Sequence, residues 1–148
     1  PAEWAGLDIP EKANSYPEAR MFGRLPAYGF YCRHVKGLRL RNVEFQAAQG
    51  EARPAIVCDD VKDLEIAGLR SAPIAGTQPA IKLVQTKQAL LRDCVAPAGT
   101  KFFLEAQGAR TEGVVLTNSH RGAAAKAAQA GPDVPGNALT LSGNIGQS

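Results

Sequence analysis

Residues 29–45 read GFYCRHVKGLRLRNVEF, and residues 55–71, which begin 26 positions later, read AIVCDDVKDLEIAGLRS. Like residues stand over one another in this alignment: Cys32 over Cys58, Val35 over Val61, Leu38 over Leu64. Self-similarity at a fixed period of this length is typical of solenoids, in which each repeat packs against its neighbours. The pair of segments therefore predicts a repeat architecture.

The register continues along the chain with a period close to 25 residues. Three apolar ladders follow it: Leu40, Ile66, Leu91, Leu116 and Leu141; Leu38, Leu64, Ala89, Val114 and Leu139; and Phe30, Ile56, Ile81 and Phe102. The last step of the third ladder shortens to 21 residues, and the missing residues return in QGARTEG (107–113). This stretch predicts a longer turn in the fourth coil.

Apolar residues alternate with polar ones inside each repeat, as at Phe30/Cys32 and Leu38/Leu40. Such alternation indicates a strand with one buried face. Turn-forming or polar residues separate the short strands, at Gly37, Asp63 and Gln88. We therefore predict an all-β chain, a single right-handed parallel β-helix of about five coils of about 25 residues over 29–148.

Two other architectures share some of these signals. An antiparallel β-sandwich also has strands at regular spacing, but it does not require like residues to recur in ladders. Leucine-rich repeats share the period, but their LxxLxLxxN signature is missing.

Two regions stand outside the repeat. Residues 1–28 are rich in proline, with Ile9-Pro10, Tyr16-Pro17 and Leu25-Pro26, and are expected to form an extended segment that covers the outside or one end. Residues 121–131, RGAAAKAAQAG, have high helix propensity, whereas the register predicts a strand near 127–130. The sequence does not decide between a helix and a strand in this stretch.

One column of turn formers recurs where the chain leaves the Leu40-type strand. It consists of Asn42, Gly68, Asp93 and Asn118. These residue types tolerate left-handed backbone geometry, so their role is structural.

Composition excludes several classes of protein. Net charge is +3, from 17 basic and 14 acidic residues that alternate in sign, which does not favour nucleic acid as a partner. No run of 18 apolar residues occurs, so no membrane-spanning helix is expected.

The three cysteines are odd in number and show no CxxC spacing. Cys32 and Cys58 occupy the same inward position in consecutive coils, where parallel Cβ vectors suit a disulfide poorly. We expect buried free thiols, no metal site and no cofactor.

Residues 9–45 and the segments that follow resemble the C-terminal part of bacterial proteins of the polygalacturonase family, glycoside hydrolase family 28. The likeness rests on Tyr16-Pro17-Glu18, Met21-Phe22-Gly23, Leu25-Pro26-Ala27-Tyr28-Gly29-Phe30-Tyr31, Arg33-His34, Arg53-Pro54-Ala55 and Asp59-Asp60-Val61. The resemblance implies a right-handed parallel β-helix that acts on pectin-type polysaccharide by inverting hydrolysis. It also implies a secreted or periplasmic location.

The family carries its catalytic groups in N-T-D, D-D and G-H-G motifs followed by R-I-K. This sequence has no N-T-D, G-H-G or R-I-K. The resemblance therefore implies a C-terminal portion of such a hydrolase, a fragment of a longer solenoid that itself lacks the catalytic carboxylates. The alternative is a non-catalytic β-helix module that binds polysaccharide or serves as a structural spacer.

Asp59-Asp60 is similar to the D-D motif, but the repeat places Arg33 beside Asp59 and His34 beside Asp60, about 5 Å away. Opposite charges stacked in this way favour ion pairs over catalysis. The other histidine, His120, has no nucleophile placed with it by the pattern.

The better binding candidates lie on the outer face. One outward row is expected to contain Tyr31, Val57, Lys82 and Phe103, and the next Arg33, Asp59, Val84 and Glu105. Aromatic and basic groups there suit a sugar chain by stacking and carboxylate pairing, unless residues 1–28 cover this face. The predicted substrate-binding residues are Tyr16, Arg20, Tyr28, Tyr31 and Arg33, the partner an acidic plant polysaccharide.

An isolated β-helix exposes unpaired backbone groups at an open end. We therefore expect self-association through that end unless residues 1–28 cover it.

Overall fold

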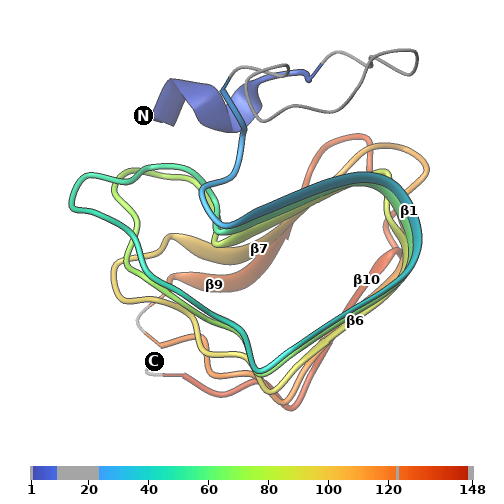
Figure 1. Cartoon of the computed structure of the whole chain (residues 1–148). Helices are drawn as coiled ribbons and strands as arrows, with labels where there is room; N and C mark the ends of the chain where they lie inside the picture. Colours follow the sequence, from blue (N-terminus) through green and yellow to red (C-terminus); the bar gives the residue numbers. More distant parts are fainter. Residues whose placement is uncertain (1, 10–23, 123, 147–148) are drawn as a thin grey trace.

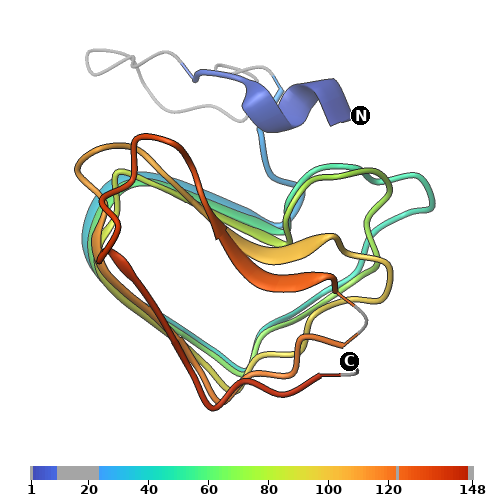
Figure 2. The same ribbon diagram turned by 180° about the vertical axis from the view of Figure 1, so that it is seen from behind.

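The computed structural model describes residues 2–9, 24–122 and 124–146. From Phe30 onward the described residues form a right-handed parallel β-helix. Seen from the N-terminal rung in Figure 1, the chain winds clockwise as it recedes, and Figure 2 shows the last rung in front. The elements are η1 (Ala2–Gly6), β1 (Phe30–Arg41), β2 (Glu44–Phe45), β3 (Ile56–Ala67), β4 (Arg70–Ser71), β5 (Ile81–Val84), β6 (Lys87–Arg92), β7 (Phe102–Gln107), β8 (Glu112–Thr117), β9 (Lys126–Ala130) and β10 (Leu139–Ser142).

Five rungs stack in parallel register: β1, β3, β5–β6, β7–β8 and β9–β10, so about four turns separate the first from the last. The Leu40 ladder and the Leu38 ladder pair residue by residue as the repeat predicts. The predicted fold is therefore confirmed. No helix in the described part of the chain is long and apolar enough to cross a membrane.

The core runs along the axis of the solenoid and is made by the inward residues of the middle rungs. Ile56, Leu83, Leu91 and Leu104 are fully buried. A side chain of this size contributes roughly 1.5–3 kcal/mol when it leaves water. Because each rung supplies a few such residues, the fold depends on stacking rather than on any one coil.

Residues with a left-handed backbone conformation (positive φ) form the corners of each coil. The predicted column Asn42, Gly68, Asp93 and Asn118 has positive φ angles of 53°, 68°, 55° and 47°, and Gly143 extends it. Two further columns turn the chain inside β1 and β3 and at the equivalent points of the next two rungs: His34, Asp60, Gln85 and Gly108; and Gly37, Asp63, Gln88 and Gly113. Stacked corners of equal geometry keep successive rungs in register.

The third predicted ladder is wrong at its last member. Ile81 pairs with Leu104, 23 residues later, while Phe102 pairs with Lys126. The error is two residues, which leaves the inward face unchanged because side chains alternate with period two. The longer turn expected in 107–113 is present between β7 and β8.

The alanine-rich stretch after residue 121 contains a strand. β9 continues the ladder, with Ala128 beside Leu104 and Ala130 beside Ala106. Pairing with β7 thus overrides the local helix propensity of this stretch.

Candidate functional site

A cleft of about 190 Å³ lies between the N-terminal segment and the outer face of the first four rungs. We call it the outer cleft; its walls are Ala5, Gly6, Leu7, Asp8, Pro26, Tyr31, Val57, Asp59, Lys82, Val84 and Gln107. Both ribbon views show η1 alongside the solenoid, outside its cross-section (Figures 1 and 2). A cleft smaller than a drug-sized pocket suits a single ring-sized group.

Arginines hold the N-terminal segment against the solenoid. The Nη1 atom of Arg33 donates to the carbonyl oxygen of Ile9 at 2.7 Å. The Nη1 atom of Arg53 donates to the carbonyl oxygen of Leu25 at 3.2 Å. These bonds fix the wall of the outer cleft that η1 supplies.

The Trp4 ring adds a second attachment, because it faces two guanidinium groups. The Cζ atoms of Arg24 and Arg53 lie 4.3 Å and 5.1 Å from its ring centroid. Distances below about 6 Å are favourable for a cation–π interaction. The described part of the N-terminal segment is thus attached by polar and aromatic contacts.

Lys82 is the cation on the floor of the outer cleft. Its side chain is half-buried, and within the described residues its ammonium group makes no hydrogen bond or ion pair. Its neighbours in register are Val57 on one side and Glu105 on the other. Glu105 in register and Asp8 and Asp59 in the cleft are the carboxylates near it, and since none of them forms an ion pair with it, the ammonium group can bind an anionic group of a ligand.

The Tyr31 ring lies two rungs from Lys82 in the same outward row. Burial raises the pKa of its phenol, so the hydroxyl group stays neutral and can donate a hydrogen bond. With Asp59 and Gln107 in the same cleft, the walls offer an aromatic surface, acceptors and an amide. This combination is suited to a carboxylated sugar.

The predicted binding residues separate in the structure. Tyr31 lines the outer cleft, and Arg33 flanks it with Nε 3.0 Å from Oδ2 of Asp59. Tyr28 packs edge-on against Phe45, with ring centroids 6.3 Å apart, and does not line the cleft. Tyr16 and Arg20 fall outside the described residues.

Both predicted outward rows need correction at the fourth rung. Glu105, not Phe103, follows Lys82, and Gln107, not Glu105, follows Val84. Phe103 is buried in the core. The two-residue register error that misplaced Phe102 shifts both rows. Phe103 itself is buried because it precedes Leu104 as the fully buried Ala55 and Ala80 precede Ile56 and Ile81.

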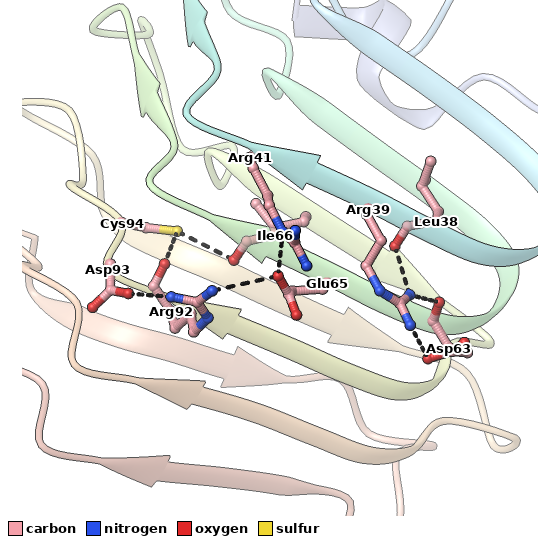
Figure 3. Close-up of polar contacts among 9 residues, drawn as sticks. All are labelled: Leu38, Arg39, Arg41, Asp63, Glu65, Ile66, Arg92, Asp93 and Cys94. Carbon is pink, nitrogen blue, oxygen red and sulfur yellow. Dashed lines mark hydrogen bonds and ion pairs between the residues drawn. The ribbon is translucent and has the colours of Figure 1, made fainter.

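A second charged surface lies on β1, β3 and β6, on the part of each rung that follows the corner column of Gly37. We call it the arginine–carboxylate network; it comprises Arg39, Arg41, Asp63, Glu65, Arg92 and Asp93 (Figure 3). Oε1 of Glu65 accepts from Nε of Arg41 at 2.9 Å and from Nη2 of Arg92 at 3.5 Å. One carboxylate thus joins arginines of the first and third rungs.

The remaining members of the network form local pairs. Nη2 of Arg39 lies 2.9 Å from Oδ1 of Asp63, and Nη1 of Arg92 lies 2.7 Å from Oδ2 of Asp93. Asn118 donates to Oδ1 of Asp93 at 2.6 Å and is the first cause of the lowered pKa of that carboxyl. Three positive and three negative groups cancel, so this network aligns rungs rather than attracting a charged ligand.

The carboxylates of Asp59 and Asp60 each pair with a basic residue of the preceding rung. Asp59 meets Arg33, and Oδ2 of Asp60 lies 2.6 Å from Nδ1 of His34. The hydrogen bond from His34 is the main cause of the lowered pKa of Asp60. The stacking of these pairs agrees with the register of the repeat.

The three cysteines are free and buried. Cys32 and Cys58 are partners in register, and the hydrogen bond to Cys32, followed by burial, raises the pKa of the Cys58 thiol. Among the described residues no group of three or more His, Cys, Asp or Glu side chains is placed to hold a metal ion.

Sequence reasoning placed Lys82 on the outer face but did not select it for binding. The signal available was a lysine in the Tyr31 row with no acid beside it in the preceding repeat. The contribution of η1 to the cleft carried no comparable signal, since it depends on contacts made by a non-repeating segment.

Comparisons with known protein families, with curated proteins and with solved structures give no match.

Proposed function

We propose that this chain binds an acidic polysaccharide of the pectin type and is a non-catalytic β-helical portion of a protein that acts on such a polymer. The observation that carries the proposal is that the half-buried Lys82 and, two rungs away in the same outward row, Tyr31 both line the outer cleft. A carboxylate of a uronic acid would pair with the ammonium group, and the ring would pack on the phenol. A polymeric substrate of this kind favours a secreted or periplasmic location.

The carboxylates support a binding role more than a hydrolytic one. Inverting hydrolysis needs a carboxylic acid whose pKa is raised, opposite a carboxylate base. The carboxyl groups with perturbed pKa values among the described residues are Glu51, Asp60, Glu65 and Asp93, and all four are lowered. Each stays ionised near neutral pH and cannot serve as a general acid there.

The resemblance to the polygalacturonase family supports the choice of polymer. The segments that carry it include Tyr28-Gly29-Phe30-Tyr31, which leads into β1 and supplies Tyr31 to the outer cleft. In the proposed arrangement the hydrolytic carboxylates belong to another part of the protein. The present chain would hold the polymer or extend the solenoid.

The test is a titration of the full chain with trigalacturonate, followed by isothermal calorimetry, with a neutral galactose trisaccharide as comparison. We expect binding of the acidic sugar and loss of roughly tenfold or more in affinity in Lys82→Gln, because a charge-assisted bond is removed. Lys62→Gln is the matched control, since Lys62 is exposed and lies outside the cleft.

Three results would overturn the proposal: no binding of trigalacturonate, equal affinity for both sugars, or an equal loss in the two lysine variants. Release of reducing ends from polygalacturonate by the purified chain would contradict its non-catalytic part. Tyr31→Ala gives an independent check, because it removes the stacking surface and leaves the charge.

A further inference from the structure

The first rung leaves one edge of the sheet without a partner. Within the described residues β1 pairs with β3 alone, whereas β3 pairs with β1 on one side and with β5 and β6 on the other. Half of the backbone N–H and C=O groups of a strand point to each side. The free edge of β1 therefore presents a row of donors and acceptors that can extend the sheet.

The inward side chains of β1 are incompletely covered. Phe30, Leu38 and Leu40 are half-buried, although they occupy the same ladders as buried residues one rung later. Their partners Ile56, Leu64 and Ile66 are 0%, 2% and 1% exposed. The core thus ends with apolar groups that another rung would cover.

The outward side chains of β1 share one sign of charge. Arg33, Lys36, Arg39 and Arg41 lie on this strand, and no Asp or Glu does. The adjacent β3 carries Asp59, Asp60, Asp63 and Glu65 against the single cation Lys62. A basic rung therefore stacks on an acidic one.

The middle of the solenoid shows how a charged residue is satisfied when it has rungs on both sides. Glu65 contacts Arg41 of the rung before and Arg92 of the rung after. Among the residues that the structure describes, Arg41 has such a contact only toward Glu65, through Nε, and its side chain is 61% exposed. Its two Nη groups are available for a carboxylate beyond the free edge.

The strands of the last rung do not supply that carboxylate. β9 and β10 contain Lys126 and neutral residues, with no acid in either strand. A second copy stacked head to tail would cover the apolar ladders, but its strands would bring no carboxylate to the basic row of β1 beyond those that β3 already supplies. Charge complementarity thus favours a different occupant.

We propose that the free edge of β1 docks a further parallel β-helical rung whose outer face is acidic. The incoming strand resembles β3 in chemistry: alternate apolar residues continue the core, and a carboxylate pairs with Arg41 while others lie opposite the remaining basic residues of β1. This extends the proposed role as one portion of a longer β-helix. It is tested without any sugar, so the two proposals fail separately.

The probe is a fluorescently labelled peptide with the sequence of residues 55–71 carrying Cys58→Ser, since this segment already pairs with β1 on its other side. Binding to the full chain is measured by anisotropy at several salt concentrations. The control peptide also carries Asp59→Asn, Asp60→Asn, Asp63→Asn and Glu65→Gln. We expect the acidic peptide to bind with an affinity that falls with salt and the neutral one to bind at least roughly fivefold more weakly.

Two protein variants locate the contact. Arg41→Gln should weaken the acidic peptide roughly two- to fivefold. Arg92→Gln removes the other arginine of Glu65 but lies two rungs from the edge, so the affinity should stay as in the wild type. Equal binding of both peptides, or equal loss in both variants, would refute the proposal. So would sedimentation showing self-association of the chain that the peptide does not displace.

Discussion

Glu51 and Arg53 form a two-bond ion pair in the loop between β2 and β3. Nε of Arg53 donates to Oε1 of Glu51 at 2.9 Å, and Nη2 donates to Oε2 at 2.8 Å. Oε1 also accepts from the backbone N–H groups of Ala52 and Arg53. Both side chains are largely buried, at 12% and 17% exposed, so the pair is shielded from water.

This ion pair predicts that the free energy of unfolding of the protein depends on pH in the acidic range. The bonds from Arg53 lower the pKa of Glu51 to about 2, below the usual 4.5. A depressed pKa contributes stability that is fully present above pH 4.5 and is lost as the pH falls toward 2. We expect Glu51→Gln to cost roughly 1–3 kcal/mol at pH 7 in urea unfolding and less as the pH falls.

Glu44→Gln, at an exposed position of β2, is the control and should leave the free energy of unfolding nearly unchanged. The explanation would be wrong if the difference between wild type and Glu51→Gln were the same at pH 7 and pH 2.

Arg53 also predicts how the N-terminal segment is attached. It contacts the carbonyl oxygen of Leu25 and the ring of Trp4, which is the single tryptophan of the chain. In Arg53→Gln we expect a red shift of Trp4 emission and greater quenching by acrylamide, with the far-UV circular dichroism preserved. Arg41→Gln removes an arginine remote from Trp4 and should change neither; unaltered emission in Arg53→Gln would exclude this attachment.

The repeat predicts the two long ladders because their inward positions hold Leu, Ile, Val or Ala in every coil. Prediction fails at Phe102 because three apolar residues, Phe102, Phe103 and Leu104, occur in succession. Either Phe102 or Leu104 satisfies the alternation, and only pairing with β5 selects Leu104. Local pattern determines the face of a strand, whereas register depends on the neighbouring rung.

The candidate site also has one part that the repeat predicts and one part that it does not. Tyr31 and Lys82 lie in an outward row that the period places correctly. Their enclosure in a cleft depends on η1, whose contacts lie outside any repeat. The sequence therefore predicts the outward face of the sheet that carries the site, but it does not show which part of that face η1 encloses to form the outer cleft.

Gly68 provides a test of the corner column. Its φ is +68°, and a Cβ built there would lie 2.5 Å from Oδ1 of Asn42. We expect Gly68→Ala to destabilise the protein by about 1–2 kcal/mol or more, because the cost of a left-handed conformation for alanine and the cost of the close contact with Asn42 add together. Gly136→Ala, where no atom lies within 4 Å, should change the free energy of unfolding little. Equal thermal shifts in the two variants would contradict the role of the column.

The column of Lys36, Lys62 and Lys87 is an exception to the pairing of opposite charges. Lys62 lies in register with Lys36 on one side and Lys87 on the other. Like charges directly opposite in a sheet are destabilising, and opposite charges contribute roughly 0.2–1 kcal/mol. Lys62→Glu should therefore stabilise the chain by about 0.5–1 kcal/mol, measured by urea unfolding, whereas Lys62→Gln should gain less.

The matched control for net charge is Lys126→Glu, because Lys126 pairs with Phe102 rather than with another cation. The gain in Lys62→Glu should shrink in 1 M salt, since exposed charges are screened there. A gain of the same size in Lys126→Glu would mean that total charge, not the lysine column, limits stability. The absence of any gain in Lys62→Glu would show that the ammonium groups already lean apart, so that stacking in register does not bring their charges together.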